Sequence, residues 1–272
     1  MLDSLYIAAT GMQAQQLNVD TIANNLTNVN TATFKKGRVS FTDLVAVEAE
    51  RLGPGGQAAA SAADASAAAG PLATIARTGV GVGVASVGKL FDTGTITATG
   101  STWDLAVNGD GFVEVSMPDG SIAYTRGGTL KVNSDGVLVT QSGYPLKPGI
   151  TVPANATSMS ISSSGAVTAV VPNQTNAVTL GQLQLARFAN PGALSAQGGD
   201  LYRSTDASGE PITGNAGQDG IGTLVQGSLE GSNVKLVDEM VNLMVAQRAY
   251  EASVKVAQAS DEMLGMINNL RK

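Results

Sequence analysis

The sequence predicts an α+β fold in which helices at the two ends of the chain flank a central antiparallel β region. Apolar residues recur at three- and four-residue intervals in residues 1–30 and again in 234–270, a pattern typical of amphipathic helices. Between these ends, short runs rich in Thr, Val and Ile alternate with Asn-Gly, Asp-Gly and Ser-Gly turn signals. These signals predict hairpins, and therefore an antiparallel sandwich or barrel, from about residue 79 to about residue 225.

The first expected element is a helix over the first thirty residues. Asp3 or Ser4 can accept hydrogen bonds from the free backbone N–H groups at its start. An Asn-rich run predicts its end near residues 28–31, because Asn side chains compete for backbone hydrogen bonds. One apolar stripe follows the helical spacing and is interrupted at Gln16. The stripe contains Leu2, Leu5, Ala9, Met12, Val19, Ala23 and Leu26.

A segment of unusual composition follows. Gly53–Gly70 holds nine Ala and four Gly in eighteen residues, too few large side chains to build a core. Two interpretations stay open, a flexible low-complexity linker or an ordered element that docks on a partner.

The central region carries the strand and turn signals. Among the expected strands are Thr95–Thr99, Phe112–Ser116, Leu130–Val132 and Val137–Thr140. The stretch Val107–Gly111 superficially resembles a calcium loop but lacks the twelve-residue ligand spacing, so we interpret Asn108-Gly109 as a hairpin turn. Asp119-Gly120, Asp135-Gly136 and Ser142-Gly143 are further predicted turns. The glycines at 79, 81, 83 and 88 are not followed by a helix signal, and we predict a strand of small residues there rather than a dinucleotide loop.

The last expected element is a helix over residues 234–270. Gly231–Asn233 provides a start signal, and Asp238 and Glu239 suit the positive end of a helix dipole. At 1.5 Å per residue the helix is roughly 55 Å long. It is apolar around much of its circumference, which predicts burial on several sides by neighbouring chains. Its main stripe contains Leu236, Met240, Leu243, Tyr250, Val254, Ala257 and Leu264.

Composition and charge exclude several classes of functional site. The chain has no His and no Cys, which excludes Cys/His zinc sites, Cys nucleophiles, disulfides and His general bases. Both ends are charge-balanced, so the net charge of −6 lies in the middle, and no basic patch suited to nucleic acid is present. The N-terminus lacks a basic n-region, so no cleaved secretory signal is expected. We predict no catalytic, cofactor-binding or metal-binding residues.

Three sets of motifs together resemble the flagellar rod and hook protein family. Ile22–Lys35 is similar to its N-terminal signature, with matches at Ala23, Asn24, Asn25, Leu26, Asn28, Thr31, Phe34 and Lys35. The stretches Gln226–Val234 and Glu239–Glu251 resemble its C-terminal elements. The central matches are Asn108–Phe112, Ala123–Gly128 and Gly136–Gly143. The sequence departs from the signature at Thr33, where the family usually has Gly, so a positive-φ turn there is either lost or formed in another way.

The resemblance implies a fold and a role. Residues 1–45 and 231–272 are expected to form an inner helical domain in which the two helices pair as a coiled coil. Residues 46–78 are expected to form an extended connecting segment, and 79–230 an outer β-rich domain. The subunit interface is expected at Leu5, Met12, Val19, Asn24, Asn25, Leu26, Asn28, Phe34, Leu236, Met240, Leu243, Tyr250, Val254 and Leu264.

In such a family, many copies build a hollow helical shaft that transmits torque from motor to hook. The expected partners are further copies of the chain, other rod proteins, the hook protein and surrounding basal-body ring proteins, without nucleic acid or a small-molecule substrate. Export without a cleaved signal, through the flagellar type III apparatus, is expected. The size and the long segment after Leu44 most resemble the distal-rod members.

Two alternatives remain open. The first is a larger proximal rod or hook-type protein of the same family. The second, from another class, is a secreted β-sandwich adhesin or hydrolase, in which a carboxylate pair such as Asp104 and Asp110 serves a glycosidase.

Overall fold

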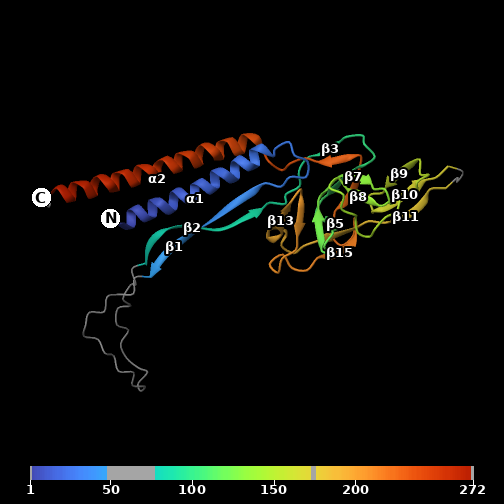
Figure 1. Ribbon diagram of the computed structural model, residues 1–272, viewed down its shortest axis with the longest axis horizontal. Helices are drawn as coiled ribbons and strands as arrows, with labels where there is room; N and C mark the ends of the chain where they lie inside the picture. Colours follow the sequence, from blue (N-terminus) through green and yellow to red (C-terminus); the bar gives the residue numbers. More distant parts are fainter. Residues whose placement is uncertain (1, 48–76, 173–175, 271–272) are drawn as a thin grey trace, which may run out of the picture. The chain divides into compact units, whose positions relative to one another are not determined.

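The computed structural model describes residues 2–47, 77–172 and 176–270 (Figure 1). Helix α1 (Leu2–Thr27) and helix α2 (Leu236–Leu270) lie at the two ends of the sequence, with strands between them. The predicted order of terminal helices around a β region is therefore confirmed. Within the described ranges, no helix combines the length and hydropathy that a bilayer crossing requires. The chain divides into two compact units, which we describe separately.

The first unit contains most of α1, most of α2 and a two-stranded sheet. Strand β1 (Gly37–Val47) pairs with strand β2 (Arg77–Lys89), and most of both strands belongs to this unit. Strand β1 is not among the predicted strands, because residues 37–45 were expected to belong to the helical domain. The signal was present, since this stretch is rich in β-branched and aromatic residues. Most of the predicted connecting segment 46–78, including Gly53–Gly70, lies outside the described residues.

Small residues let helix α1 approach both of its neighbours in this unit. A Cβ built on Gly11 of α1 would lie 3.4 Å from Ser253 Oγ of α2. On another side, Thr10 Oγ1 accepts a hydrogen bond from Val82 N of β2 (3.4 Å). Gly81 has φ +136°, and a Cβ there would overlap the Thr10 hydroxyl. The prediction of a small-residue strand at β2 is thus confirmed, and its glycine makes room for the helix.

The second unit comprises residues 20–38 and the described part of 87–244. Its β domain holds a six-stranded sheet (β13-β14-β6-β5-β12-β15), a four-stranded sheet (β16-β4-β7-β8), a three-stranded sheet (β11-β10-β9) and the pair β17-β3. Each strand pair of this unit whose register is described is antiparallel, as predicted. The strands are β3 (Ile96–Ala98), β4 (Asp104–Asn108), β5 (Phe112–Ser116), β6 (Ile122–Thr125), β7 (Gly127–Val132), β8 (Leu138–Thr140), β9 (Ser158–Ile161), β10 (Ala166–Val170), β11 (Val178–Gln182), β12 (Gln184–Arg187), β13 (Ser195–Gly198), β14 (Leu201–Arg203), β15 (Ile212–Asn215), β16 (Thr223–Gln226) and β17 (Ser228–Glu230), with a 3-10 turn at Pro191–Ala193.

Two hydrophobic clusters fill this domain. The larger is aliphatic and gathers inward-facing residues of several sheets, such as Leu105, Val113 and Leu185. The smaller is aromatic, with edge-to-face contacts among Phe91, Phe112, Tyr124, Phe188 and Tyr202.

One predicted hairpin is wrong. Asn108-Gly109 joins β4 of the four-stranded sheet to β5 of the six-stranded sheet, and these two strands do not pair with each other. Gly109 and Gly111 both have positive φ, which turns the chain from one sheet to the other. By contrast, Asp119-Gly120 and Asp135-Gly136 connect strands that do pair, so these two hairpins are confirmed.

Candidate functional site

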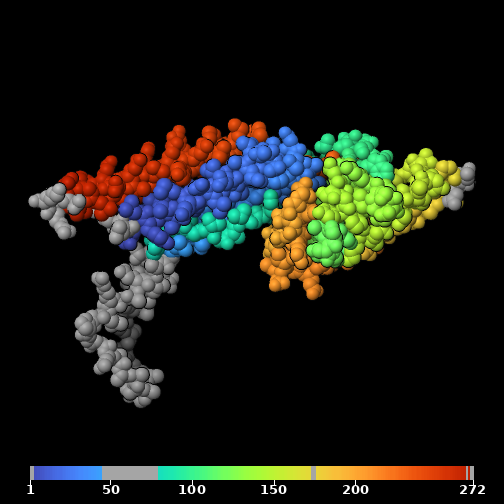
Figure 2. Space-filling view, viewed as in Figure 1, coloured from blue at the N-terminus to red at the C-terminus, as the bar shows by residue number. Residues whose placement is uncertain are grey.

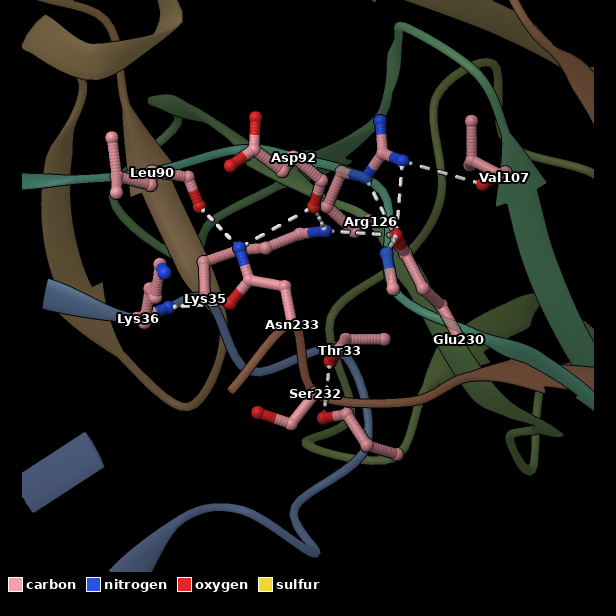
Figure 3. Close-up of polar contacts among 12 residues, drawn as sticks. Thr33, Lys35, Lys36, Leu90, Asp92, Val107, Arg126, Glu230, Ser232 and Asn233 are labelled. Carbon is pink, nitrogen blue, oxygen red and sulfur yellow. Dashed lines mark hydrogen bonds and ion pairs between the residues drawn. The ribbon is translucent and has the colours of Figure 1, made fainter. Parts of the chain in front are cut away.

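The polar side chains of both terminal motifs meet in the second unit, at a site that we call the junction. It consists of the connector Thr33–Gly37, the segment Lys89–Gly94 and the segment Glu230–Asn233, together with Asn25 and Arg126. Figure 3 shows the contacts around Lys35, Arg126, Glu230 and Asn233. The connector follows the end of α1, because the chain leaves the helix after Thr27 through a series of turns. The junction therefore joins parts of the chain that lie about 200 positions apart in sequence.

A buried carboxylate lies at the centre of the junction. Glu230 Oε1 accepts hydrogen bonds from Lys35 Nζ (2.8 Å) and Gly94 N (2.9 Å). Its Oε2 pairs with Arg126 Nε (3.1 Å), and Arg126 Nη2 lies 3.3 Å from Oε1. Lys35 and Glu230 have no exposed surface, and Arg126 is 2% exposed. The cluster carries two positive charges against one negative charge.

Backbone carbonyl groups accept further hydrogen bonds from the two cations. Lys35 Nζ also donates to Asp92 O (2.7 Å). Arg126 donates to Gly111 O (2.7 Å) and to Val107 O (3.3 Å), which flank the turn between β4 and β5. Among the described residues, no buried side-chain nitrogen or oxygen lacks a hydrogen-bond partner. Such complete pairing is the condition under which a buried charge is tolerated.

Burial and pairing act in opposite directions on the charged groups. Burial alone would raise the pKa of Glu230, but hydrogen bonds and charges from Arg126 and Lys35 outweigh it and hold this pKa below its usual value. The pKa of Lys35 is lowered, because desolvation outweighs the attraction of Glu230. Both cations thus contribute to stabilising the carboxylate in its charged form.

Two asparagine side chains hold the connector backbone. Asn25 accepts from Gly37 N (2.7 Å) and donates to Gly37 O (2.9 Å), as a neighbouring strand would, and it also contacts Glu239 Oε2 (3.3 Å). Asn233 accepts from Lys36 N (2.8 Å) and donates to Leu90 O (2.8 Å). A side-chain amide offers both a donor and an acceptor, which explains why Asn suits these two positions.

Thr33 adopts the left-handed turn that the sequence analysis left open. Its φ is +62°, although Thr is β-branched and strongly disfavours this region. Its backbone N–H donates to Glu230 O (2.7 Å), and its hydroxyl lies 2.9 Å from Asp200 Oδ2. The turn is therefore formed without Gly, with tertiary contacts on both its backbone and its side chain.

The predicted interface residues differ in exposure. Asn25 and Phe34 are buried within the subunit, and the ammonium of Lys89 lies 4.3 Å from the Phe34 ring centroid. Contact with a neighbouring chain is open to the exposed and half-buried members of the set. Exposed members are Asn24, Leu236, Met240 and Tyr250, and half-buried members are Leu5, Met12, Val19, Leu26, Asn28, Leu243, Val254 and Leu264.

Helix α2 leaves much of its apolar surface open. Leu236 and Met240, which the sequence analysis put on one stripe with Leu243, are 47% and 50% exposed. The least exposed positions of α2 include small residues instead, such as Ala246 and Ser260. Figure 2 shows α2 at the outline of the first unit, with side chains that project into the open. In this unit a groove of about 440 Å³ is lined by Gln16, Val19, Gln247, Tyr250 and Glu251.

The carboxylate pair of the hydrolase alternative is not placed as an acid and base pair. Asp104 is buried, and its two oxygens accept hydrogen bonds from the hydroxyls of Thr99 (2.5 Å) and Thr129 (2.8 Å). Asp110 is exposed on the turn after β4. The Asp104 carboxylate thus joins strand β7 to the segment before β4.

Sequence reasoning missed the charged residues of the junction. Lys35, Arg126 and Glu230 all lie inside the stretches that carried the family resemblance, but no electrostatic role was assigned to them. The available signal was a charged residue within a run of small and apolar residues, as in Ser228–Gly231.

Comparison with known proteins identifies families that match three parts of the chain. Residues 5–35 match the family described as flagella basal body rod protein, 106–169 the flagellar hook protein FlgE/F/G D1 domain, and 225–270 the flagellar basal body rod FlgEFG protein C-terminal family. The chain is 42% identical over 275 residues to the flagellar basal-body rod protein FlgG of Borreliella burgdorferi, covering 100% of both chains.

Further relatives match over nearly the same length. FlgG of Caulobacter vibrioides is 42% identical over 270 residues, covering 99% of this chain and 100% of the relative. FlgG of Bacillus subtilis is 37% identical over 282 residues, covering 100% of both. The matches include both terminal helices and the segments that build the junction, and the chain belongs to the flagellar basal-body rod protein family.

Proposed function

We propose that this chain is a structural subunit of the distal part of the flagellar rod, and that its copies assemble into a hollow helical shaft that transmits torque. The three relatives described above, which match over nearly the full length, are named as basal-body rod proteins. The proposal places the chain in the basal body, in contact with other rod proteins and the hook protein, and assigns it no catalytic activity.

The observation that carries the proposal is the exposed apolar surface of α2. Val237, Met244 and Val245 are 69%, 57% and 63% exposed. Other large apolar side chains of α2 with substantial exposure are Leu236, Met240, Val241, Tyr250, Val256, Met263, Met266 and Ile267. Full burial of one such side chain is worth about 1.5–3 kcal/mol, so several together provide a strong drive toward association. Neighbouring copies of the same helix are the simplest source of that burial.

Pairing of α1 and α2 as a coiled coil is part of the proposal. The close approach of Gly11 to Ser253 supports it, as does the 3-4 spacing of the apolar stripes. In an assembled shaft, the faces of both helices that their own chain leaves open would be covered by other subunits.

Met244 offers a direct test, because its exposure makes damage to the subunit fold small. We expect Met244→Glu to abolish polymerisation of the purified chain, measured by sedimentation and electron microscopy, and to abolish swimming when it replaces the wild-type gene. The physical reason is that an unpaired carboxylate would be buried in the interface. Met244→Leu preserves volume and polarity and serves as the matched control.

The β domain should unfold at the wild-type temperature in both variants. Polymers and swimming of wild-type quality in a folded Met244→Glu variant would contradict the interface. If the chain forms the expected filaments but these filaments do not transmit torque, the proposed role in the rod would be wrong.

A further inference from the structure

We infer that Asp200 is a positioning residue that holds the connector turn at Thr33 in one conformation against the β domain. The inference goes beyond subunit assembly, because it concerns the conformation of a single chain. It therefore does not rest on the proposed function.

The first argument is the backbone of Thr33. A β-branched residue at φ +62° is disfavoured, and such a conformation persists only when the surroundings hold it. Thr33 is 3% exposed, and its N–H donates to Glu230 O at 2.7 Å. A backbone bond alone would serve equally well with Gly at this position, which is free of the strain. The Thr side chain must therefore contribute something that Gly lacks.

The second argument is the carboxylate that faces this side chain. Thr33 Oγ1 lies 2.9 Å from Asp200 Oδ2 and 2.6 Å from Ala32 O. The hydroxyl has one hydrogen, and a carboxylate is the stronger acceptor. Ala32 is the preceding residue and cannot fix the turn against the β domain. Asp200 belongs to the β domain, at the turn between β13 and β14, so its bond with Thr33 ties the connector to that domain.

The backbone turn that carries Asp200 and the burial of its carboxylate also support the inference. Gly198, Gly199 and Asp200 all have positive φ (+89°, +60° and +59°), a tight turn that ends with the carboxylate half-buried against the connector. Burial raises the pKa of Asp200, while the Thr33 hydroxyl and the Lys89 charge oppose this shift. A half-buried carboxylate costs free energy unless it is paired, and Thr33 provides the hydrogen bond.

Lys89 contacts the two connector residues that follow Thr33. Its Nζ donates to Lys35 O (2.9 Å) and lies over the Phe34 ring. Asp200 acts on Thr33 and Lys89 acts on the next two residues, so consecutive connector residues are held by one acidic and one basic side chain that also attract each other. The arrangement leaves the connector little freedom to change direction.

Amide hydrogen exchange on the full monomeric chain tests this inference. The readout is the exchange of the Thr33, Lys36 and Gly37 amides, all of which donate within the junction. We expect Thr33→Val, which keeps the β-branched shape but removes the hydroxyl, to raise these rates about ten-fold or more, the size expected for losing a hydrogen bond to a charged group. Asp200→Ala should raise them at least as much, because it also removes the attraction to Lys89. Thr33→Ser should leave the rates near the wild-type values.

A matched control and a double variant separate this role from general damage. Thr31→Val removes an exposed hydroxyl of the same segment, which donates to Asn28 Oδ1, and should not change exchange at the three amides. The combination of Thr33→Val with Asp200→Ala should exchange no faster than Asp200→Ala alone, because the bond that Thr33→Val removes is already absent in Asp200→Ala. Asp200→Asn keeps an acceptor oxygen and should lie between the wild type and Asp200→Ala.

Three results would overturn the inference: wild-type exchange in Thr33→Val, equal effects of Thr33→Ser and Thr33→Val, or multiplying effects in the double variant. Because the measurement uses the monomer, failure of the rod assignment would leave these outcomes unchanged.

Discussion

Replacing Glu230 by Gln removes the negative charge that Lys35 and Arg126 share, with nearly no change in side-chain volume. The wild-type carboxylate accepts from Lys35 Nζ, Gly94 N and two nitrogens of Arg126. In the variant, two buried cations face a neutral amide, and its NH2 group is turned toward their donors. Removing one partner of a buried ion pair typically costs about 3–5 kcal/mol. For a domain of this size that corresponds to a fall in Tm of about 6–20 °C.

The assay is urea unfolding of the monomer, followed by the fluorescence of Trp103, the sole tryptophan of the chain. Glu251→Gln is the matched control, because Glu251 pairs with Arg248 on the surface of α2, where the two side chains are 55% and 82% exposed. Its loss should stay below about 0.5 kcal/mol, as is usual for exposed pairs.

A second substitution distinguishes unpaired charge from lost packing. In the Glu230→Gln background, Lys35→Met removes one of the two unpaired cations and should recover part of the lost free energy of unfolding. A loss below about 1 kcal/mol in Glu230→Gln, or a further loss on adding Lys35→Met, would refute the view that charge balance stabilises the junction.

Three further predictions concern the same unit. First, folding lowers the pKa of Glu230, so this residue should contribute to stability fully above the ordinary glutamate pKa of 4.5 and lose that contribution as pH falls through the lower folded value. Unfolding free energies measured across acidic pH should show this step in the wild type but not in Glu230→Gln. Second, Asn25→Ala should cost about 1–3 kcal/mol, because buried partners lose their hydrogen bonds, while Asn24→Ala, at an exposed neighbouring position, should stay within about 0.5 kcal/mol in the same urea experiment. Third, a Cβ at Gly94 would overlap the carbonyl oxygen of Gly231, so Gly94→Ala should lower Tm. Gly149→Ala should not, because no atom lies within 4 Å of the added Cβ. Equal Tm values for the two variants would show that the backbone accommodates the methyl group at Gly94.

The sequence was enough to predict the helices, many of the strands and the family, because each depends on the pattern of residues that are close in sequence. Apolar spacing gave both terminal helices close to their observed bounds, Leu2–Thr27 and Leu236–Leu270. Turn chemistry gave the hairpins at Asp119-Gly120 and Asp135-Gly136. The same rule failed at Asn108-Gly109, since a turn signal shows that the chain changes direction but not whether the flanking strands share a sheet.

Tertiary structure decided which charges meet and which faces stay open. Lys35 and Glu230 are 195 positions apart, and no local pattern connects them; only the pairing of β17 with β3 and the path of the connector bring them to 2.8 Å. The left-handed turn at Thr33 likewise depends on contacts from Asp200 and Glu230, which override the intrinsic preference of a β-branched residue. The spacing of α2 marks several apolar stripes, whereas the position of the neighbouring elements determines which stripe its own chain covers.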